Sequence, residues 1–505
     1  MAFYGGALAL AIILDARRSG ATAARHGAVA YGVATAAAAL LALTSAWSDE
    51  IVYYALSWFQ PMLFAAIAVG FAAVAWLEHR GIERRRAWAV GGAVPVALGA
   101  GVLLVGTASL ERGLAFLFRS DVVATTLLES RSLLELGPGY ALRWLTPVGV
   151  LLPVLWGAAA MLAVRRNRLD PLLAGALAIG ALATPLTLLQ MRFGPHAAVA
   201  SALIAAWLIA QANAAAVRVA LVAVLALTLA WDVRPATLPD SAVHPYLLGG
   251  FDALVWLRQS APRTSHFRQP ERRAEYGVAA EWVWGHWITQ IGQKPNVANP
   301  LGQTPANVRG VAEVARLLLA ESEDEALAAT DRLDVRYLLL SAMPVTFGEM
   351  TVQAGRDPRR YITTDANGAP IFHDAFFKTF YARLYVGSGA GDHDTAPVPS
   401  VRLVFESRVH VDFRGTRPAV RIFEVVPGAW LEGTCAADTV EVRAELSGTE
   451  VVYTAGQPKS ADGAFSVHMP YASEDAEASI PARIVVRCGA EEVDVSVSER
   501  DVLEG

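Results

Sequence analysis

The feature that most constrains this chain is a succession of apolar segments in its first 235 residues. A helix needs roughly 17–25 predominantly apolar residues to cross a bilayer. Backbone polar groups in hydrocarbon must be satisfied within the protein, so such segments fold as helices. They predict a multi-pass membrane domain over residues 1–235, with about seven or eight hydrophobic segments. These segments are 27–47, 51–77, 87–108, 144–164 and 171–190, the shorter pair 195–212 and 217–231, and the run 2–14, which is too short to span alone.

The arginines of this first part indicate its orientation. Residues 1–235 contain 17 Arg, no Lys and 11 acidic residues, a net charge of +6, whereas the remaining residues carry −11. Cytoplasmic loops are enriched in Lys and Arg. We therefore expect the arginine loops in the cytoplasm, and the 109–143 loop and everything after residue 235 on the extracytoplasmic side of the cell membrane. The positive charge then reflects topology and predicts no nucleic-acid partner. The arginine loops are 17–25, 80–86 and 165–168.

Two patterns divide the second half of the chain. In residues 236–400, the segments 311–320 and 321–333 predict helices and 335–340 predicts a buried strand, which indicates a mixed α/β domain. From residue 401 to 505 short strands alternate with turn residues, as in a β-sandwich or barrel. The expected fold is therefore a multi-pass α-helical membrane domain, an extracytoplasmic α/β domain and a C-terminal β-rich module.

Both cysteines, Cys435 and Cys488, lie in the C-terminal module. The extracytoplasmic side of a membrane permits disulfides. Two thiols alone do not decide whether they pair, so the free and the bonded forms both stay open.

Signature motifs of common soluble enzymes are absent from the sequence. It contains no Walker loop, no HExxH, no GxSxG and no CxxC. The first candidate site residue is instead Glu129, in the segment Thr126–Ser130 of the 109–143 loop. Its carboxylate offers the hard oxygen that a divalent cation prefers, or an acceptor for an amide. The alternative is a solvated loop acid, since charged residues are mostly exposed.

The second candidate is Arg192, in the segment Gln190–Phe193 between two apolar segments. Arginine this close to hydrocarbon is costly and is commonly functional. Its guanidinium matches the oxygens of a phosphate or pyrophosphate. The alternative is an arginine whose stem lies along the apolar surface while its head group reaches water.

The third candidate is the tryptophan-rich segment Tyr276–Ile288, which contains Trp282, Trp284 and Trp287. Tryptophan commonly carries much of the binding energy of a recognition surface. The alternative is an aromatic core or a belt that rests on the membrane. His286 fits a hydrogen-bonded structural histidine better than a metal ligand.

The order of these three segments resembles the catalytic subunit of oligosaccharyltransferase, particularly the archaeal and bacterial single-subunit forms of the GT-C type. Thr126–Glu129 is similar to the TIXE-type motif of the family's large external loop. Gln190–Phe193 is similar to the arginine-bearing segment of one of its later transmembrane helices, and Tyr276–Ile288 to its WWDYG region. The resemblance covers nearly the whole chain from residue 87. It continues through Asn296–Pro300, Asp334–Ser341, Phe347–Met350, Phe380–Tyr385, Arg421–Ala429, Ala461–Gly463 and Pro470–Tyr471.

The resemblance implies protein N-glycosylation. A glycan on a polyprenyl or dolichyl (pyro)phosphate is transferred to Asn of an Asn-X-Ser/Thr sequence in an acceptor protein, in a membrane, with Mn²⁺ or Mg²⁺ as cofactor. Glu129 would bind the metal or the acceptor amide, and Arg192 would neutralise the leaving (pyro)phosphate. The implied donor-binding residues are Arg192, Gln190 and His196, and the implied acceptor-binding residues are Trp282, Trp284, Gly285, Glu281 and Met350.

Two departures from the family pattern leave alternatives open. Glu281 stands in place of the first Trp of WWDYG, and Val283 in place of the Asp that accepts a hydrogen bond from the acceptor hydroxyl. The family's acidic DXD-type loop has no match, since Asp15 and Asp49-Glu50 lie in other contexts. We therefore expect a chain that is incomplete at its N-terminus. The alternatives are a GT-C transferase with a different acceptor and a non-catalytic, membrane-anchored paralogue that binds glycan or protein.

Overall fold

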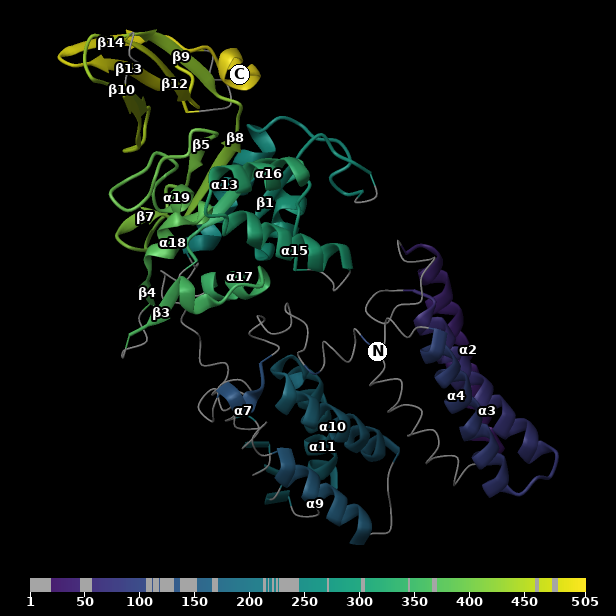
Figure 1. The fold of residues 1–505 in the computed structure, drawn as a ribbon. Coiled ribbons are helices and arrows are strands. Elements are labelled where there is room, and N and C mark those ends of the chain that lie inside the picture. The colour runs from purple at the N-terminus through teal and green to yellow at the C-terminus, as the bar shows by residue number, and fades with distance from the viewer. Residues whose placement is uncertain are drawn as a thin grey trace. The chain divides into compact units, whose positions relative to one another are not determined.

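The chain divides into two compact units, Met1–Thr237 and Leu238–Gly505, which are described separately (Figure 1). This description rests on a computed structural model. The residues that it describes are 20–45, 57–105, 111, 118, 131–136, 152–165, 171–211, 215–216, 218–219, 222–223, 226, 245–269, 272–300, 305–343, 346–365, 370–458, 463–474 and 480–505.

The described part of the first unit is helical, as the apolar segments predicted. Among the described residues, three stretches are long and apolar enough to cross a membrane: Ala21–Leu43, Phe59–His79 and Met191–Gln211. The predicted segments 2–14 and most of 217–231 lie outside the described residues. The helices are α2 (Ala21–Leu43), α3 (Phe59–His79), α4 (Arg84–Val105), α7 (Leu133–Leu136), α9 (Leu152–Arg165), α10 (Pro171–Leu189), the 3₁₀ turn η2 (Met191–Phe193) and α11 (Gly194–Gln211).

Helices α3 and α4 approach closely at two glycines. A Cβ atom on Gly91 would lie 2.2 Å from the Val74 side chain and 2.8 Å from the carbonyl oxygen of Gly70. Small residues permit this close approach. Inside a membrane no hydrophobic force drives two helices together, so such close van der Waals packing stabilises their contact instead. Helix α4 continues through Pro95, whose ring lies against Gly70.

Helices α9, α10 and α11 form a second packed group. The indole of Trp156 in α9 covers Gly180 of α10 so closely that a Cβ there would overlap the ring, at 1.6 Å. Leu173 of α10 and Ile204 of α11 are fully buried in the same cluster. This packing holds the α10–η2–α11 connection in place.

The second unit is built on a four-stranded sheet with the order β1-β2-β8-β5. Strand β1 runs parallel to β2, whereas β8 is antiparallel to both β2 and β5. Helix α13 packs on the sheet through Leu254 and Leu257, which lie in one buried cluster with Val278 and Ile422. The elements are α13 (Pro245–Gln259), β1 (Gly277–Ala280), β2 (Val335–Ser341), β5 (Val401–Glu406) and β8 (Val420–Val425).

Short helices and hairpins complete this α/β part, coloured teal and green in Figure 1. The predicted helices 311–320 and 321–333 correspond to α15 and α16, and the predicted strand is β2. The elements are η3 (Trp282–Trp284), α14 (Gly285–Trp287), the π-helical turn η4 (Ile288–Gly292), α15 (Pro305–Leu318), α16 (Glu323–Arg332), α17 (Phe347–Gln353), η5 (Pro358–Arg360), β3 (Ile362–Thr364), β4 (Pro370–Phe372), α18 (Asp374–Lys378), α19 (Phe380–Tyr385), β6 (His410–Asp412) and β7 (Thr416–Pro418).

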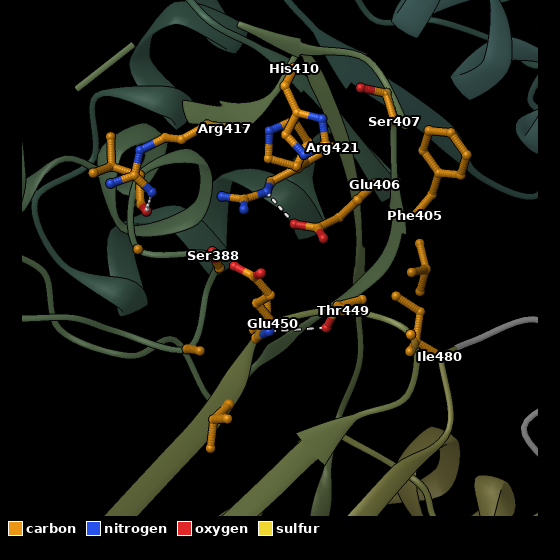
Figure 2. A pocket seen from close by; sticks show the side chains of 18 of the residues that line it. Ser388, Phe405, Glu406, Ser407, His410, Arg417, Arg421, Thr449, Glu450 and Ile480 are labelled. Carbon is orange, nitrogen blue, oxygen red and sulfur yellow. Dashed lines mark hydrogen bonds and ion pairs between the residues drawn. The ribbon is translucent and has the colours of Figure 1, made fainter. Parts of the chain in front are cut away.

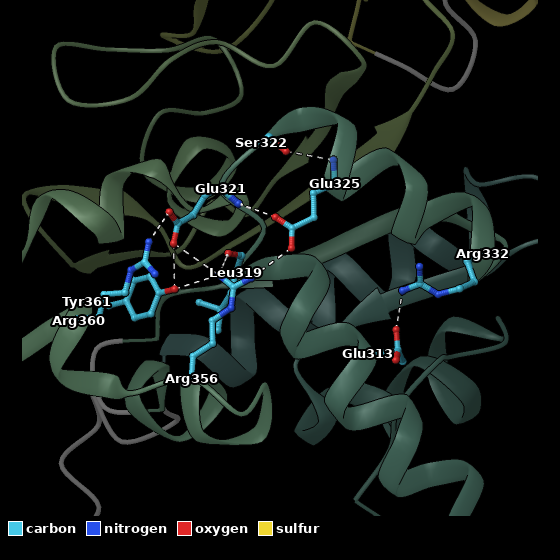
Figure 3. A network of polar contacts seen from close by, with 9 residues as sticks. All are labelled: Glu313, Leu319, Glu321, Ser322, Glu325, Arg332, Arg356, Arg360 and Tyr361. Carbon is cyan, nitrogen blue, oxygen red and sulfur yellow. Dashed lines mark hydrogen bonds and ion pairs between the residues drawn. The ribbon is translucent and has the colours of Figure 1, made fainter.

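A polar network ties the start of α16 to the segment after α17 (Figure 3). The Glu321 carboxylate accepts hydrogen bonds from Arg360 at 2.7 Å and from the Tyr361 hydroxyl at 3.0 Å. Arg356 donates to the carbonyl of Leu319 at 2.8 Å and to the Tyr361 hydroxyl at 3.0 Å. These bonds restrain the position of α17 and of the residues that precede it.

The C-terminal strands form separate sheets, with the orders β11-β10-β13-β14 and β12-β9. The expected boundary at residue 401 is corrected by the strand pairing: β5 and β8, assigned to the C-terminal module, hydrogen-bond into the α/β sheet through β2. Cys435 and Cys488 form a disulfide. The elements are β9 (Ala429–Thr434), β10 (Thr439–Leu446), β11 (Val452–Pro458), β12 (Ala464–Met469), β13 (Ala482–Cys488), β14 (Glu491–Val495) and α20 (Glu499–Glu504).

A buried charge cluster connects α20 to the α/β sheet. Arg402, 1% exposed, donates to Glu424 at 2.6 and 2.9 Å and to Glu499 at 2.6 and 2.7 Å. Glu424 also accepts hydrogen bonds from Arg336 at 2.8 Å and from the Tyr337 hydroxyl at 2.9 Å. Every carboxylate oxygen of the cluster therefore has a donor, which is the condition under which buried charges are tolerated.

Candidate functional site

The connection between α10 and α11 brings together the predicted donor-binding residues. Gln190 is buried and extended, with φ −146° and ψ 120°, and Arg192 lies in the turn that follows. His196 lies in the first turn of α11, with its ring 6.5 Å from that of Phe193. Arg192 therefore directly precedes the N-terminus of an 18-residue helix. A helix N-terminus and a neighbouring guanidinium together favour an anion.

This connection is hydrogen-bonded to the chain that follows the predicted loop motif. The backbone N–H of Met191 donates to the carbonyl oxygen of Arg131 at 3.0 Å. The hydroxyl of Ser132 donates to the carbonyl of Leu188 at 2.8 Å. Glu129 itself lies outside the described residues. The chain two residues beyond it is nevertheless held against the residue next to Arg192.

The predicted acceptor segment begins where the buried strand β1 ends. Glu281 follows β1, and Trp282–Trp284 then form the turn η3 at the carboxyl end of a parallel strand pair. The carboxyl ends of parallel strands are common ligand positions. Trp282 is half-buried, and Val283 and Trp287 are exposed.

Glu281 lies in an environment that disfavours its charge. Burial, together with the nearby carboxylate of Glu349, raises the pKa of Glu281 to about 7, against a hydrogen bond from Thr346 that lowers it. The buried hydroxyl of Tyr381 is close enough for the Glu281 charge to affect it. A carboxyl group with this pKa changes charge near neutral pH, which is a property shared by many functional acids.

Trp284, Gly285 and Met350 are buried. The indole N–H of Trp284 donates to the Ser341 hydroxyl at 3.1 Å. A Cβ on Gly285 would lie 2.1 Å from the carbonyl oxygen of Ala298, so only glycine fits there. The side chains of Trp284 and Met350 support the segment from within, while Glu281, Trp282 and Val283 reach its surface.

The structure places the predicted residues in two groups. Gln190, Arg192 and His196 lie in the first unit, and the acceptor segment with Met350 lies in the second. Within the described residues, no three His, Cys, Asp or Glu side chains lie close enough to hold a metal ion. The expected ligand Glu129 is not among the described residues.

The sequence patterns did not indicate several residues that support the site. Ser132 and Arg131 hold the α10–η2 connection, Ser341 accepts from Trp284, and Thr346 donates to Glu281. The last two come from β2 and from the residue that precedes α17, far along the chain from the tryptophan segment. No local pattern connects them to it.

These features define a class of protein: a membrane protein with long apolar helices, an α/β part and a β-rich C-terminal part. Residues 428–505 match the family described as the archaeal glycosylation protein B long peripheral domain. Dolichyl-phosphooligosaccharide-protein glycotransferase 1 of Archaeoglobus fulgidus is 30% identical over 102 residues, which are 20% of this chain and 15% of that protein. Dolichyl-monophosphooligosaccharide-protein glycotransferase AglB of Haloferax volcanii is 31% identical over 91 residues, 15% of this chain and 8% of that protein.

Solved structures extend the similarity to the whole fold. Archaeal oligosaccharyltransferase AglB from A. fulgidus, in complex with an inhibitory peptide and a dolichol-phosphate, has a TM-score of 0.69 and 18% identity, and the match covers 100% of this chain and 73% of that one. The A. fulgidus enzyme tethered to an acceptor peptide with an NVT sequon has a TM-score of 0.64 and 17% identity, with the same coverage. The chain therefore has the fold of archaeal oligosaccharyltransferase, as the resemblance to that family predicted.

Proposed function

We propose that this protein transfers a glycan from a dolichyl or polyprenyl (pyro)phosphate to the side-chain nitrogen of Asn in acceptor proteins. The observation that carries the proposal is the hydrogen bond from Met191 to Arg131. It ties the turn η2, which contains Arg192, to the chain directly after the segment Thr126–Glu129. The order of these two segments along the chain resembles that of the catalytic parts of oligosaccharyltransferases. The relatives that share this fold are named for the same chemistry.

In the proposed reaction the asparagine nitrogen forms a bond to the anomeric carbon of the glycan and loses one proton to the solvent. The bond from that carbon to the (pyro)phosphate oxygen breaks, and its electron pair stays on the leaving group. Arg192 and the N-terminus of α11 stabilise the negative charge that develops there, with Gln190 and His196 as further donor-binding residues. Stabilising charge where it develops is commonly the largest catalytic contribution. Glu129 accepts hydrogen bonds from the acceptor amide or holds a metal ion.

Mn²⁺ or Mg²⁺ is the expected cofactor, with Glu129 as a ligand. Such an ion would supply Lewis-acid and template chemistry. We further propose a multi-pass topology in which residues 238–505 lie on the extracytoplasmic side. The supporting observations are the arginine-rich short loops and the Cys435–Cys488 disulfide.

The acceptor is proposed to bind along Glu281, Trp282 and Val283. Val283 has no hydrogen-bonding group, so it cannot pair with a Ser or Thr hydroxyl at the +2 position of the acceptor. The carboxyl group of Glu281 is the polar group two residues away. Because its pKa is raised to about 7, it becomes a full hydrogen-bond acceptor only as the pH rises through that value.

A peptide series tests this function. Membranes containing the full-length protein are supplied with a dolichyl-phosphate-linked glycan and with peptides that carry Asn-X-Thr, Asn-X-Ala or Gln-X-Thr. We expect transfer to both Asn peptides and none to the Gln peptide. Alanine at +2 should lower kcat/KM by about tenfold, the loss of one modest hydrogen bond, and not by the roughly 10⁴-fold expected of a site built to pair with the hydroxyl.

The pH dependence of acceptor preference tests the proposed role of Glu281 separately from that of Val283. If Glu281 accepts from the hydroxyl, the Thr-over-Ala preference should rise between about pH 6 and pH 8, since Glu281 ionises over that range, and Glu281→Gln should remove the rise. A strict Ser/Thr requirement at all pH values contradicts the argument from Val283. Transfer of the glycan to a different acceptor group, with no Asn product, would favour the GT-C alternative.

A further inference from the structure

A polar cavity lies in the second unit, and none of the residues that line it belongs to the tryptophan segment (Figure 2). Its volume is about 1000 Å³, within the range of ligand sites. Three parts of the chain surround it: the loop after α19, the strands from β5 to β8, and the β10–β11 turn. It thus lies between the α/β sheet and the C-terminal β-rich strands.

Two arginines line the cavity with hydrogen-bond donors to spare. Arg421, whose side chain is 6% exposed, donates Nε to Glu406 at 2.7 Å and Nη1 to the carbonyl of Tyr385. Its Nη2 group has no partner among the described residues. Figure 2 shows the Arg421 guanidinium beside the Glu406 carboxylate, among the side chains that line the cavity. Arg417 donates Nη1 to the carbonyl of Val386, while its buried Nε has no partner among the described residues.

The two guanidinium groups affect each other. Burial, and in addition the positive charge of Arg421, lower the pKa of Arg417. Arg417 has no ion pair in the part of the chain that the structure describes. Asp392, whose charge opposes the lowering of the Arg417 pKa, already accepts three hydrogen bonds from the Asp394–Thr395 turn. An anion placed between Arg417 and Arg421 would satisfy their remaining donors and relieve their repulsion.

The remaining lining resembles a saccharide site more than a site for a small bare anion. Hydroxyl groups in its lining include those of Ser388, Thr416 and Ser447, and the ring of Phe405 lies on one side (Figure 2). The hydroxyls of Ser407 and Thr449 also line it but already donate to the carbonyls of Val409 and Leu446. Hydroxyls can donate and accept, as sugar hydroxyls require. Glu450 is exposed on the β10–β11 turn and provides an acceptor for such groups. The cavity is also far larger than one oxyanion needs.

We infer that this cavity binds an acidic saccharide, whose carboxylate pairs with Arg417 and Arg421 and whose hydroxyls meet the hydroxyl groups around them. Bidentate contacts between arginine and carboxylate are strong and directional. The inference concerns a second site and does not depend on the proposed transfer reaction.

Calorimetric titration of the full-length protein in detergent tests the inference. The probes are methyl β-D-glucuronide, methyl β-D-glucoside and inorganic phosphate. We expect the glucuronide to bind about tenfold or more tightly than the glucoside, because charge-assisted hydrogen bonds exceed neutral ones by this amount. Arg417→Gln should weaken glucuronide binding about tenfold. The matched control is Arg500→Gln in α20, an exposed arginine paired with Glu504, which should leave the affinity unchanged.

Each alternative outcome overturns part of the inference. Equal affinity for glucuronide and glucoside, or no binding of either, contradicts the anion site. Phosphate binding as tight as glucuronide binding contradicts the assignment to a saccharide. Unchanged affinity in a folded Arg417→Gln protein places the ligand elsewhere. If that variant does not fold, the comparison of the three probes on the unaltered protein decides alone.

Discussion

Replacing Arg192 with glutamine is expected to lower the rate of glycan transfer by about 10²–10³-fold, the usual effect of removing one group that stabilises transition-state charge. The substitution keeps a polar, hydrogen-bonding side chain, although a shorter one, and removes the positive charge beside the N-terminus of α11. The loss should fall mainly on kcat, because the charge on the leaving (pyro)phosphate grows as the glycosidic bond breaks. Single-turnover transfer to an Asn-X-Thr peptide measures it.

The matched control for this variant is Arg86→Gln. Arg86 is exposed at the start of α4 and pairs with Glu83 one helical turn away, and it also belongs to an arginine loop. It should retain full activity. Arg192 is excluded from the leaving-group site if its glutamine variant keeps more than about half of the unaltered rate, since an effect that small is below one modest hydrogen bond.

The largest effect on stability is expected from Arg402→Met. This change removes the guanidinium that joins Glu424 to Glu499 and leaves Glu424, 1% exposed, with fewer donors. Breaking a buried ion pair on one side costs about 3–5 kcal/mol of unfolding free energy, since the partner charge stays buried. Loss of the bond to Glu499 should also release α20, because this pair connects that helix to β5.

Denaturant unfolding of the full-length protein in detergent, followed by tryptophan fluorescence and by proteolysis near the C-terminus, measures both effects. Arg500→Met is the control: it removes an exposed arginine of α20 whose pair with Glu504 is worth little. A change in unfolding free energy below about 1 kcal/mol for Arg402→Met would contradict the role of the cluster, since this is the size of an exposed pair.

The sequence was most informative where burial alone sets the local pattern. The apolar segments predicted the helices of the first unit, and the mostly apolar segment 335–340 predicted β2, which is buried except at half-buried Arg336. The acidic start of 321–333 predicted α16, where Ser322 caps the helix by accepting from the N–H of Glu325. Both signals are contained within a few consecutive residues.

Pairing between distant segments could not be predicted in this way. Strands β5 and β8 were recognised as strands but assigned to the wrong sheet, because an alternating pattern does not specify which strand is the neighbour.

In the candidate site, the three tryptophans looked alike in sequence. Only the fold separates buried Trp284 from half-buried Trp282 and exposed Trp287, because Ser341 of β2 supplies the acceptor that lets the indole N–H of Trp284 enter the core. The raised pKa of Glu281 likewise depends on Glu349 and Thr346, which only the tertiary structure brings close.

The central claim, glycan transfer that depends on Glu129 and Arg192, is tested most directly by one comparison. The full-length protein and its Glu129→Gln variant are each incubated with a dolichyl-phosphate-linked glycan and an Asn-X-Thr peptide, and the peptide mass is followed over a single turnover. The account predicts that the unaltered protein adds the glycan to the Asn side chain and that Glu129→Gln abolishes this product while lipid-linked donor still binds. Unchanged turnover in the variant, or no transfer by the unaltered protein, would contradict it.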